Sequence, residues 1–357
     1  MSNRTTVRWW RSDGHLTARE VAFDAALRVE GGAWAEEILR KAVAKLEMRD
    51  ADLAWELVFG PLRMQAQLDH LIRRYSGKAA KLDVEVRVAL RMAIYQLRYL
   101  DRIPAHAAVS AAVELVKRAK KRSAMGFVNA VLRKVNREPV EWPGREVELS
   151  VPGWLLSRWT AAFGKERAEG IAAAALLAPA VGGQDLGAAS IVPYLGVEPG
   201  MTVLDVCAAP GNKTRQLVEA GGVVLAADRS FARLRQVTGV ERVVVDARLP
   251  LPFVKTFDRI LVDAPCSGTG TFGRNPEIKW RITPADLTDL AGRQTAILGN
   301  ALAVLAPGGR LVYSTCSLEA EENEGVVHAV CRDRVLEEGY RLPGQEPGDG
   351  FWHAVIA

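Results

Sequence analysis

Hydrophobic positions recur with the period of an α-helix through the first 135 or so residues of the chain. One stripe alternates spacings of four and three, the pattern of a helix packed in a bundle: Val86, Leu90, Ala93, Leu97 and Leu100. We predict further helices at residues 17–29, 36–46, 52–74, 104–121 and 126–134, with Pro61 kinking or dividing the third. The pattern therefore predicts an all-α helical bundle.

The pattern changes after residue 138. Three prolines, Pro139, Pro143 and Pro152, indicate a linker, after which residues 154–180 again have a helical pattern. Short, nearly continuous apolar runs then alternate with helical segments, at residues 202–206, 222–227, 242–245, 259–262 and 309–314. Such runs are typical of strands buried on both faces, so this part of the chain predicts an α/β domain with a mostly parallel sheet.

The composition is that of a folded protein with more than one domain. Hydrophobic residues make up 49% of the 357 residues and charged residues 25%, which excludes disordered, collagen-like and coiled-coil chains. The longest apolar run, residues 171–181, is about half of the ~20 residues that a membrane helix needs, and residues 1–14 lack the apolar core of a signal peptide. We therefore expect a cytoplasmic monomer with no membrane segment.

The net charge of +5 hides an uneven distribution. Residues 1–145 hold 27 Lys and Arg against 17 Asp and Glu, a net charge of +10, whereas the rest of the chain holds 20 against 25, a net charge of −5. A basic domain favours nucleic acid as a partner, because neutralising phosphates releases counterions. A basic surface that is merely solvated is the alternative.

A tight turn of small residues follows the first predicted strand and precedes a helix. Small side chains allow the backbone to approach a ligand, and the amides at a helix N-terminus are free to bind it. The turn has neither phosphate-loop spacing nor the Gly-x-Gly-x-x-Gly pattern. We predict that it binds a cofactor through Cys207, Ala208, Ala209, Pro210, Gly211, Asn212 and Lys213.

Acidic residues end three successive predicted strands. Asp228 is placed to accept hydrogen bonds from ribose hydroxyls, and Asp246 and Asp263 follow the next two strands. Any one of them alone would more often be a helix cap or a solvated turn residue. Three acids at one edge of the sheet instead predict a shared binding crevice.

The four cysteines form no metal-binding or disulfide pattern, since the chain has no Cys-x-x-Cys pair and no histidine at zinc spacing. Cys266 and Cys316 follow neighbouring predicted strands, at the edge where ligands bind. A single cysteine is usually a small buried hydrophobic residue, but two at this edge predict reactive thiols. Cys207 and Cys331 are interpreted as packing residues.

These segments resemble the RNA 5-methylcytosine methyltransferases that use S-adenosylmethionine. The resemblance lies in Asp205-Val-Cys-Ala-Ala-Pro-Gly-Asn-Lys-Thr214, Asp263-Ala-Pro-Cys-Ser-Gly-Thr-Gly270 and Tyr313-Ser-Thr-Cys-Ser317, with flanking matches at residues 274–280 and 319–324. The helical part resembles the NusB-like RNA-binding domain through residues 103–109, 112–115 and 126–133. This fusion is characteristic of the RsmB/Sun subfamily, which methylates 16S ribosomal RNA.

The resemblance implies a Rossmann-like class I methyltransferase with specific roles for its residues. Cys316 would be the nucleophile that adds to carbon 6 of cytosine, and Cys266 would assist release of the product. Asp263 would bond the base edge, and Lys213 either fixes Asp263 or is solvated. The cofactor would be S-adenosylmethionine and the partner RNA unstacked at its target base, with no metal ion.

The resemblance also divides the chain into three parts. Residues 1–138 would be the NusB-like RNA-binding domain, residues 139–182 a linker with a truncated RNA-binding region, and residues 183–357 the methyltransferase domain. The basic run at residues 117–122 would contact phosphates or cap a solvated helix end. His106 is interpreted as a packing or capping residue rather than a catalytic one.

Two departures from the family pattern leave other functions open. Asn212 stands where the family has a second glycine, a substitution that Asn tolerates if the position needs a positive φ. The chain also lacks most of the small α/β RNA-binding unit that relatives carry before the methyltransferase core. The substrate could therefore be tRNA or another RNA, or the chain could be a non-catalytic RNA-binding or ribosome-assembly factor.

Overall fold

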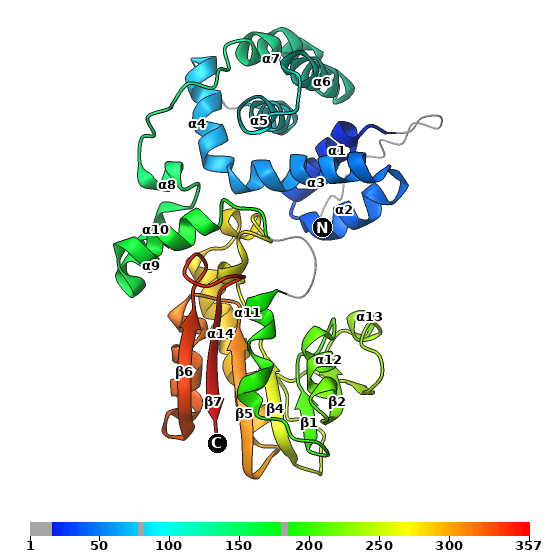
Figure 1. Ribbon diagram of the computed structural model, residues 1–357, viewed down its shortest axis with the longest axis vertical. Coiled ribbons are helices and arrows are strands. Elements are labelled where there is room, and N and C mark those ends of the chain that lie inside the picture. Colours follow the sequence, from blue (N-terminus) through cyan, green and yellow to red (C-terminus); the bar gives the residue numbers. More distant parts are fainter. Residues whose placement is uncertain (1–15, 78–81, 180–184) are drawn as a thin grey trace. The chain divides into compact units, whose positions relative to one another are not determined.

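A computed structural model describes residues 16–77, 82–179 and 185–357. The chain divides into two compact units between Glu141 and Trp142, the first helical and the second built on a seven-stranded sheet (Figure 1). None of the helices in the described residues is long and apolar enough to cross a membrane. The predicted fold class is confirmed: a helical bundle precedes an α/β domain whose sheet is mostly parallel.

The first unit is built around a central helix, α5 (Val84–Tyr99), which packs against α1, α3, α4, α6 and α7. Val86, Leu90 and Ala93 of the predicted stripe are buried, because they face these neighbours. A capping box between Thr17 and Glu20 begins α1. The other helices are α1 (Ala18–Glu30), α2 (Ala35–Ala42), α3 (Met48–Arg63), α4 (Gln65–Ser76), α6 (Ala105–Arg118) and α7 (Met125–Leu132).

The predicted helix at residues 52–74 is two helices in the structure. Pro61 lies inside α3, and the division falls three residues later, at Met64. Proline removes a backbone donor and strains the turn before it, whereas the helix ends after it, at Met64, whose φ and ψ are −97° and 16°.

The sheet of the second unit has the order β3-β2-β1-β4-β5-β7-β6. β1 to β5 run parallel, whereas β7 is antiparallel to both β5 and β6. The five predicted strands are present, and the hairpin of β6 and β7 was not predicted. The strands are β1 (Thr202–Asp205), β2 (Val223–Asp228), β3 (Glu241–Val244), β4 (Phe257–Asp263), β5 (Leu305–Thr315), β6 (Val335–Arg341) and β7 (Phe351–Ile356).

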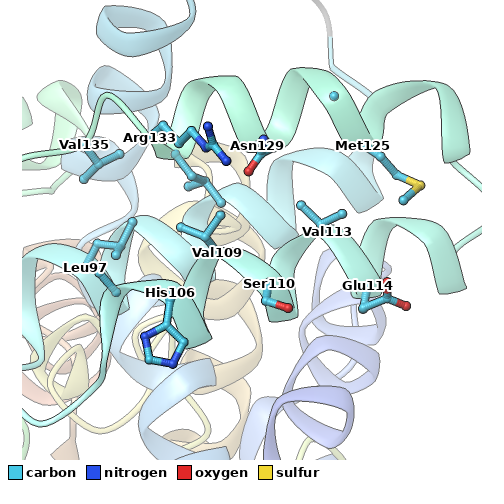
Figure 2. Close-up of a pocket in the computed structure, with 13 residues that line it drawn as sticks. Leu97, His106, Val109, Ser110, Val113, Glu114, Met125, Asn129, Arg133 and Val135 are labelled. Atoms are coloured by element: carbon cyan, nitrogen blue, oxygen red, sulfur yellow. The ribbon is translucent and has the colours of Figure 1, made fainter.

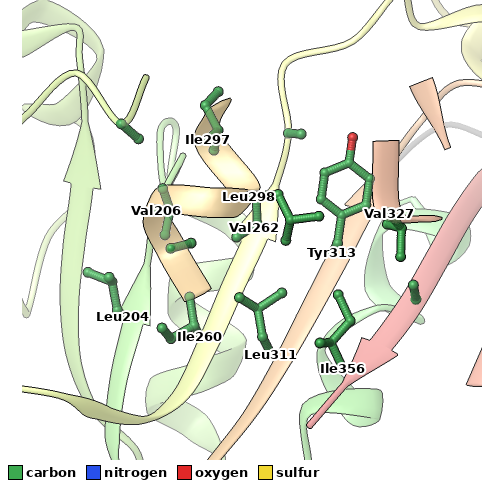
Figure 3. Close-up of a cluster of buried hydrophobic side chains, with 14 of the residues drawn as sticks. Leu204, Val206, Ile260, Val262, Ile297, Leu298, Leu311, Tyr313, Val327 and Ile356 are labelled. Carbon is green, nitrogen blue, oxygen red and sulfur yellow. The ribbon is translucent and has the colours of Figure 1, made fainter. Parts of the chain in front are cut away.

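Alternate residues of each central strand pack on opposite faces of the sheet. In β4, Ile260 and Val262 face α14 (Pro284–Leu302) and α15 (Glu324–Cys331) in the cluster shown in Figure 3, while Leu261 faces the other side. That other side is covered by α12 (Asn212–Glu219) and the 3₁₀ turn Val192–Leu195. Burial on both faces explains why these strands read as continuous apolar runs.

The residues between the bundle and the sheet are not a bare linker. They form α8 (Arg145–Glu148), α9 (Gly153–Phe163) and α10 (Lys165–Ala174), and the last two pack with Phe272 and Leu318 of the second unit. The single helix expected at residues 154–180 is divided at Gly164, whose φ is 84°. Among the described residues, no strand precedes β1, so none forms the strands of an intermediate α/β unit.

Candidate functional site

The candidate residues come together at the carboxyl edge of the sheet. β2 and β3 lie on one side of β1, and β4 and β5 lie on the other, so the strand order reverses between β1 and β4. Open α/β sheets bind their ligands in the crevice at such a point. The loops that leave β2 and β4 there begin after Asp228 and Asp263, as predicted, and the loop that leaves β1 begins after Asp205.

The loop after β1 turns sharply into α12. Gly211 has a φ of 109° and precedes the first residue of the helix, which is Asn212. Among the described non-glycine residues, only Lys120 and Ser150 have a positive φ. The left-handed conformation is therefore supplied by Gly211, and Asn212 replaces a glycine without backbone strain.

Asp228 and Asp246 have different surroundings. Asp228 is buried and accepts hydrogen bonds from the backbone N–H of Ala209 at 3.2 Å and of Ser230 at 2.8 Å, which ties β2 to the candidate cofactor loop. Asp246 forms an ion pair with Arg248, with 2.5 Å between Oδ2 and Nη2. Hydrogen bonds from Arg248 lower the pKa of Asp246 to about 2.

Asp205 is a buried carboxylate that favours a positively charged ligand in the crevice. Its Oδ2 accepts a hydrogen bond from Thr214 at 2.7 Å, and its Oδ1 is buried without a hydrogen-bond partner. Burial raises the pKa of Asp205 to about 7, and the nearby carboxylates of Asp263 and Asp228 add to the rise. A sulfonium cation would relieve this repulsion, so the residues present fit S-adenosylmethionine.

Lys213 and Asp263 form a partly buried ion pair, so Lys213 fixes Asp263 and is not simply solvated. Nζ lies 2.7 Å from Oδ2 of Asp263, and the Lys213 side chain is 11% exposed. Ser314 donates a hydrogen bond to the other carboxylate oxygen at 2.9 Å. Burial alone would lower the pKa of Lys213, but the charge of Asp263 raises it instead, so the amine is held protonated.

The two cysteines at the carboxyl edge of the sheet face each other. Cys266 follows β4, Cys316 follows β5, and their Sγ atoms are 3.3 Å apart. The hydrogen bond to Cys316, burial and the neighbouring carboxylates raise the pKa of Cys266, so Cys266 is held as a thiol. The other two cysteines pack as expected: Cys331 is buried in the core, and Cys207 is partly buried against it.

Sequence reasoning missed two buried carboxylates beside this pair, Glu319 and Glu322. Glu319 accepts hydrogen bonds from Arg158 Nε at 2.8 Å and Trp159 Nε1 at 3.0 Å, both from α9. Glu322 accepts hydrogen bonds from the residues that follow the two cysteines. The acidic run at residues 319–324 was the available signal, but an acidic run is ordinarily solvated.

The helical unit contains a hollow of its own. A cavity of about 690 Å³ lies between α6 and α7, with His106, Val109 and Arg133 among its walls (Figure 2). His106 is exposed there. A second hollow of about 260 Å³ adjoins the candidate cofactor loop, between Pro210 and Gly239.

The basic run at residues 117–122 is largely paired within the unit. Arg118 of α6 forms ion pairs with Glu20 and Asp24 of α1, and its side chain is 20% exposed. Lys121 pairs with Asp83 and Glu85. Ion pairs of this run therefore stabilise the bundle, and the run also contributes to the positive electrostatic potential of the unit.

Residues 192–354 match the family described as 16S rRNA methyltransferase RsmB/F, and residues 16–137 match the NusB family. The probable ribosomal RNA small subunit methyltransferase B of Bacillus subtilis (strain 168) is 30% identical, with 89% of this chain and 88% of that protein covered. The ribosomal RNA small subunit methyltransferase B of Klebsiella pneumoniae (strain 342) is 32% identical, with 96% and 98% covered.

The Klebsiella alignment extends over 427 positions, more than the 357 residues of this chain, so that protein has residues which this chain lacks. Among solved structures, the crystal structure of PH0851 is similar with a TM-score of 0.76 at 20% identity, covering 97% of this chain and 100% of the other. That likeness supports the fold over both units.

Proposed function

Because the chain belongs to the RsmB/F family of S-adenosylmethionine-dependent RNA cytosine-C5 methyltransferases, we propose that it methylates carbon 5 of a cytosine in 16S ribosomal RNA. The observation that carries this proposal is the pair of thiols, 3.3 Å apart, at the carboxyl ends of two neighbouring strands. Carbon 5 of cytosine is a weak nucleophile, and a thiol that adds to carbon 6 makes it enamine-like. A second thiol close to carbons 5 and 6 would assist the later elimination, in which the first thiol leaves carbon 6.

The proposed reaction divides the work between the two cysteines. The thiolate of Cys316 would add to carbon 6, and the electron pair displaced toward carbon 5 would form the bond to the methyl group that S-adenosylmethionine supplies, as the bond between that methyl and the cofactor sulfur breaks. The proton on carbon 5 would then pass to solvent, and the electron pair that it leaves would re-form the double bond between carbons 5 and 6 and expel the thiolate of Cys316. Cys266, held as a thiol beside it, assists this release.

The remaining site residues orient base and cofactor. Asp263, fixed by Lys213 and Ser314, would bond the edge of the cytosine and favour addition at carbon 6. Residues 207–213 would hold S-adenosylmethionine with Asp228 on its ribose and Asp246 farther along the edge. When bound, the cofactor supplies an electrophilic methyl group on a sulfonium.

Transfer of labelled methyl groups tests the substrate directly. We expect wild type to methylate 16S RNA, with a cytosine identified by mapping, and Cys316→Ala to transfer none. Deproteinised 16S RNA and assembled small subunits are compared as substrates, because residues 1–138 are proposed to dock RNA and can read either form. Transfer to tRNA with none to 16S RNA would overturn the substrate, and failure to bind S-adenosylmethionine would indicate an assembly factor.

A further inference from the structure

We propose that Glu322 is a positioning residue that ties the loop of Cys266 to the loop of Cys316 and so sets the distance between the two thiols. The proposal rests on the function proposed above, since it concerns the same two cysteines. It adds a residue to which neither the sequence motifs nor the family match assigns a role.

Glu322 is fully buried and has a donor for each of its acceptor positions. Oε1 accepts hydrogen bonds from the backbone N–H of Ser267 at 2.8 Å and from Nε2 of Gln294 at 3.0 Å. Oε2 accepts one from the hydroxyl of Ser317 at 2.5 Å and one from the hydroxyl of Ser267. A carboxylate offers about four lone-pair sites, so this set fills it.

These donors belong to the two loops that carry the chemistry. Ser267 directly follows Cys266, and Ser317 directly follows Cys316. Their hydroxyls are 3.1 Å apart on the same carboxylate, and the two Sγ atoms are 3.3 Å apart on the residues before them. A displacement of either loop relative to Glu322 therefore moves one thiol relative to the other.

Glu322 is itself held by the core of the unit. Its carbonyl oxygen accepts a hydrogen bond from the hydroxyl of Tyr313, a fully buried residue of β5, at 2.8 Å. The next residue, Asn323, donates to the carbonyl of Ser317 at 3.0 Å. Gln294 of α14 also donates to the carbonyl of Pro265 at 2.9 Å. These hydrogen bonds thus connect both cysteine loops to β5 and α14.

Glu322 could act through the position of its carboxylate or through its charge, and two variants separate these effects. Glu322 also contributes through its charge to the raised pKa of Cys266. Glu322→Gln keeps the length of the side chain and one acceptor oxygen, and serine hydroxyls can turn to accept from the new amide. Glu322→Asp keeps the charge but draws the carboxylate back by about 1.5 Å, one C–C bond.

Positioning predicts that Glu322→Asp is the more damaging change. Because a misplacement of 1 Å can cost about 100-fold, we expect kcat for methyl transfer to fall by ~100-fold in Glu322→Asp and by less than ~10-fold in Glu322→Gln. KM for RNA and affinity for S-adenosylmethionine should stay within about twofold of wild type in both, since Glu322 lies behind the loops. If Glu322→Gln lost more activity than Glu322→Asp, charge and not position would be the role.

Glu319→Asp is the matched control. Glu319 is a buried carboxylate of the same segment, held by α9, and its carboxylate accepts no hydrogen bond from either cysteine loop. Its shortening should lower the melting temperature and leave kcat of the folded enzyme within about twofold of wild type. If it reduced kcat as much as Glu322→Asp, a general structural effect would replace the proposed one.

Adduct formation with RNA that contains 5-fluorocytidine separates this proposal from the proposed function. Fluorine at carbon 5 cannot leave as a proton does, so the covalent protein–RNA complex persists and its rate of formation can be measured. No adduct with wild type would contradict the proposed function. An adduct with wild type that forms as fast with Glu322→Asp would contradict the role of Glu322.

A second variant keeps the test available if Glu322→Asp does not fold. Ser267→Ala with Ser317→Ala removes both hydroxyl donors and leaves the backbone N–H of Ser267 and Gln294 on the carboxylate. We expect slower adduct formation by at least ~10-fold, with cofactor affinity retained. Wild-type rates in this double variant would also overturn the proposal.

Discussion

Individual carboxylates at the edge of the sheet differ in how their charge is balanced. Asp263 pairs with Lys213, and Asp246 pairs with Arg248, whereas Asp205 forms no ion pair among the described residues and accepts a hydrogen bond from Thr214. A carboxylate that is buried without a cation prefers its proton. Asp205 is therefore the residue whose ionisation should be visible in the stability of the protein.

We expect Asp205 to make the protein less stable as the pH rises from about 4 to about 7. Its pKa is raised from 3.8 to about 7 in the folded chain, so the folded state holds a proton that the unfolded state has released. The stabilising contribution is complete below pH 4 and is lost by pH 7. Denaturation of the cofactor-free protein across this range, compared with Asp205→Asn, measures it, and a variant with the wild-type pH dependence would contradict it.

The sequence predicted the site residues that follow the ends of strands, but it did not predict the buried carboxylates that lie behind them. Cys266, Cys316 and Asp263 were recognised because the end of a parallel strand is also the edge where ligands bind. Glu319 and Glu322 lie in a 3₁₀ segment and its approach, where spacing does not show which acid points inward. Their partners come from residues far away in the sequence, such as Trp159 and Gln294.

Among the elements, α9 stabilises the segment after Cys316, although it lies outside the sheet. Trp159 is 1% exposed, its ring centre lies 5.8 Å from that of Phe272, and its Nε1–H bonds Glu319 just after Cys316. The prolines before α9 suggested a linker, and Gly164 behind it was not recognised as a break. The hairpin of β6 and β7 was missed because Glu337 and Glu338 interrupt the apolar pattern of an edge strand.

Trp159→Ala should destabilise the second unit by about 3–5 kcal/mol, because it leaves a cavity and removes a donor from a buried carboxylate. Trp159→Phe should cost about 1–3 kcal/mol, since the ring remains and only the hydrogen bond is lost. Trp154→Ala, at a half-buried position of the same helix, is the control and should cost less than Trp159→Ala. Chemical denaturation of the full chain measures all three; equal losses for Trp159→Ala and Trp154→Ala would refute the account of α9.

On the scale of the whole molecule, charge separates the two units. The net charge of +10 over residues 1–145 belongs to the NusB-matched part, and the net charge of −5 to the part that holds the site. The uneven charge and the two fold classes were predictable from composition and periodicity. The internal pairing of Arg118 and Lys121 was not, because it joins residues of different helices.

RNA binding should depend strongly on salt. If three phosphates are neutralised, affinity falls by about 40-fold between 50 and 200 mM salt. Filter binding of a 16S RNA fragment across this range measures the slope. Arg122→Ala, at an exposed position of the basic run, should lower by about one the number of phosphate contacts that the slope reports. An affinity that does not change with salt would exclude the basic unit as the docking surface.

The central claim, that Cys316 bonds the base and Cys266 releases it, is tested most directly by trapping the intermediate. Cys266→Ala is incubated with 16S RNA and S-adenosylmethionine, and the products are separated under denaturing conditions. We expect a covalent protein–RNA complex to accumulate with Cys266→Ala and to be absent with the double variant that also carries Cys316→Ala. A complex that persists without Cys316, or full methylation by Cys316→Ala alone, would contradict it.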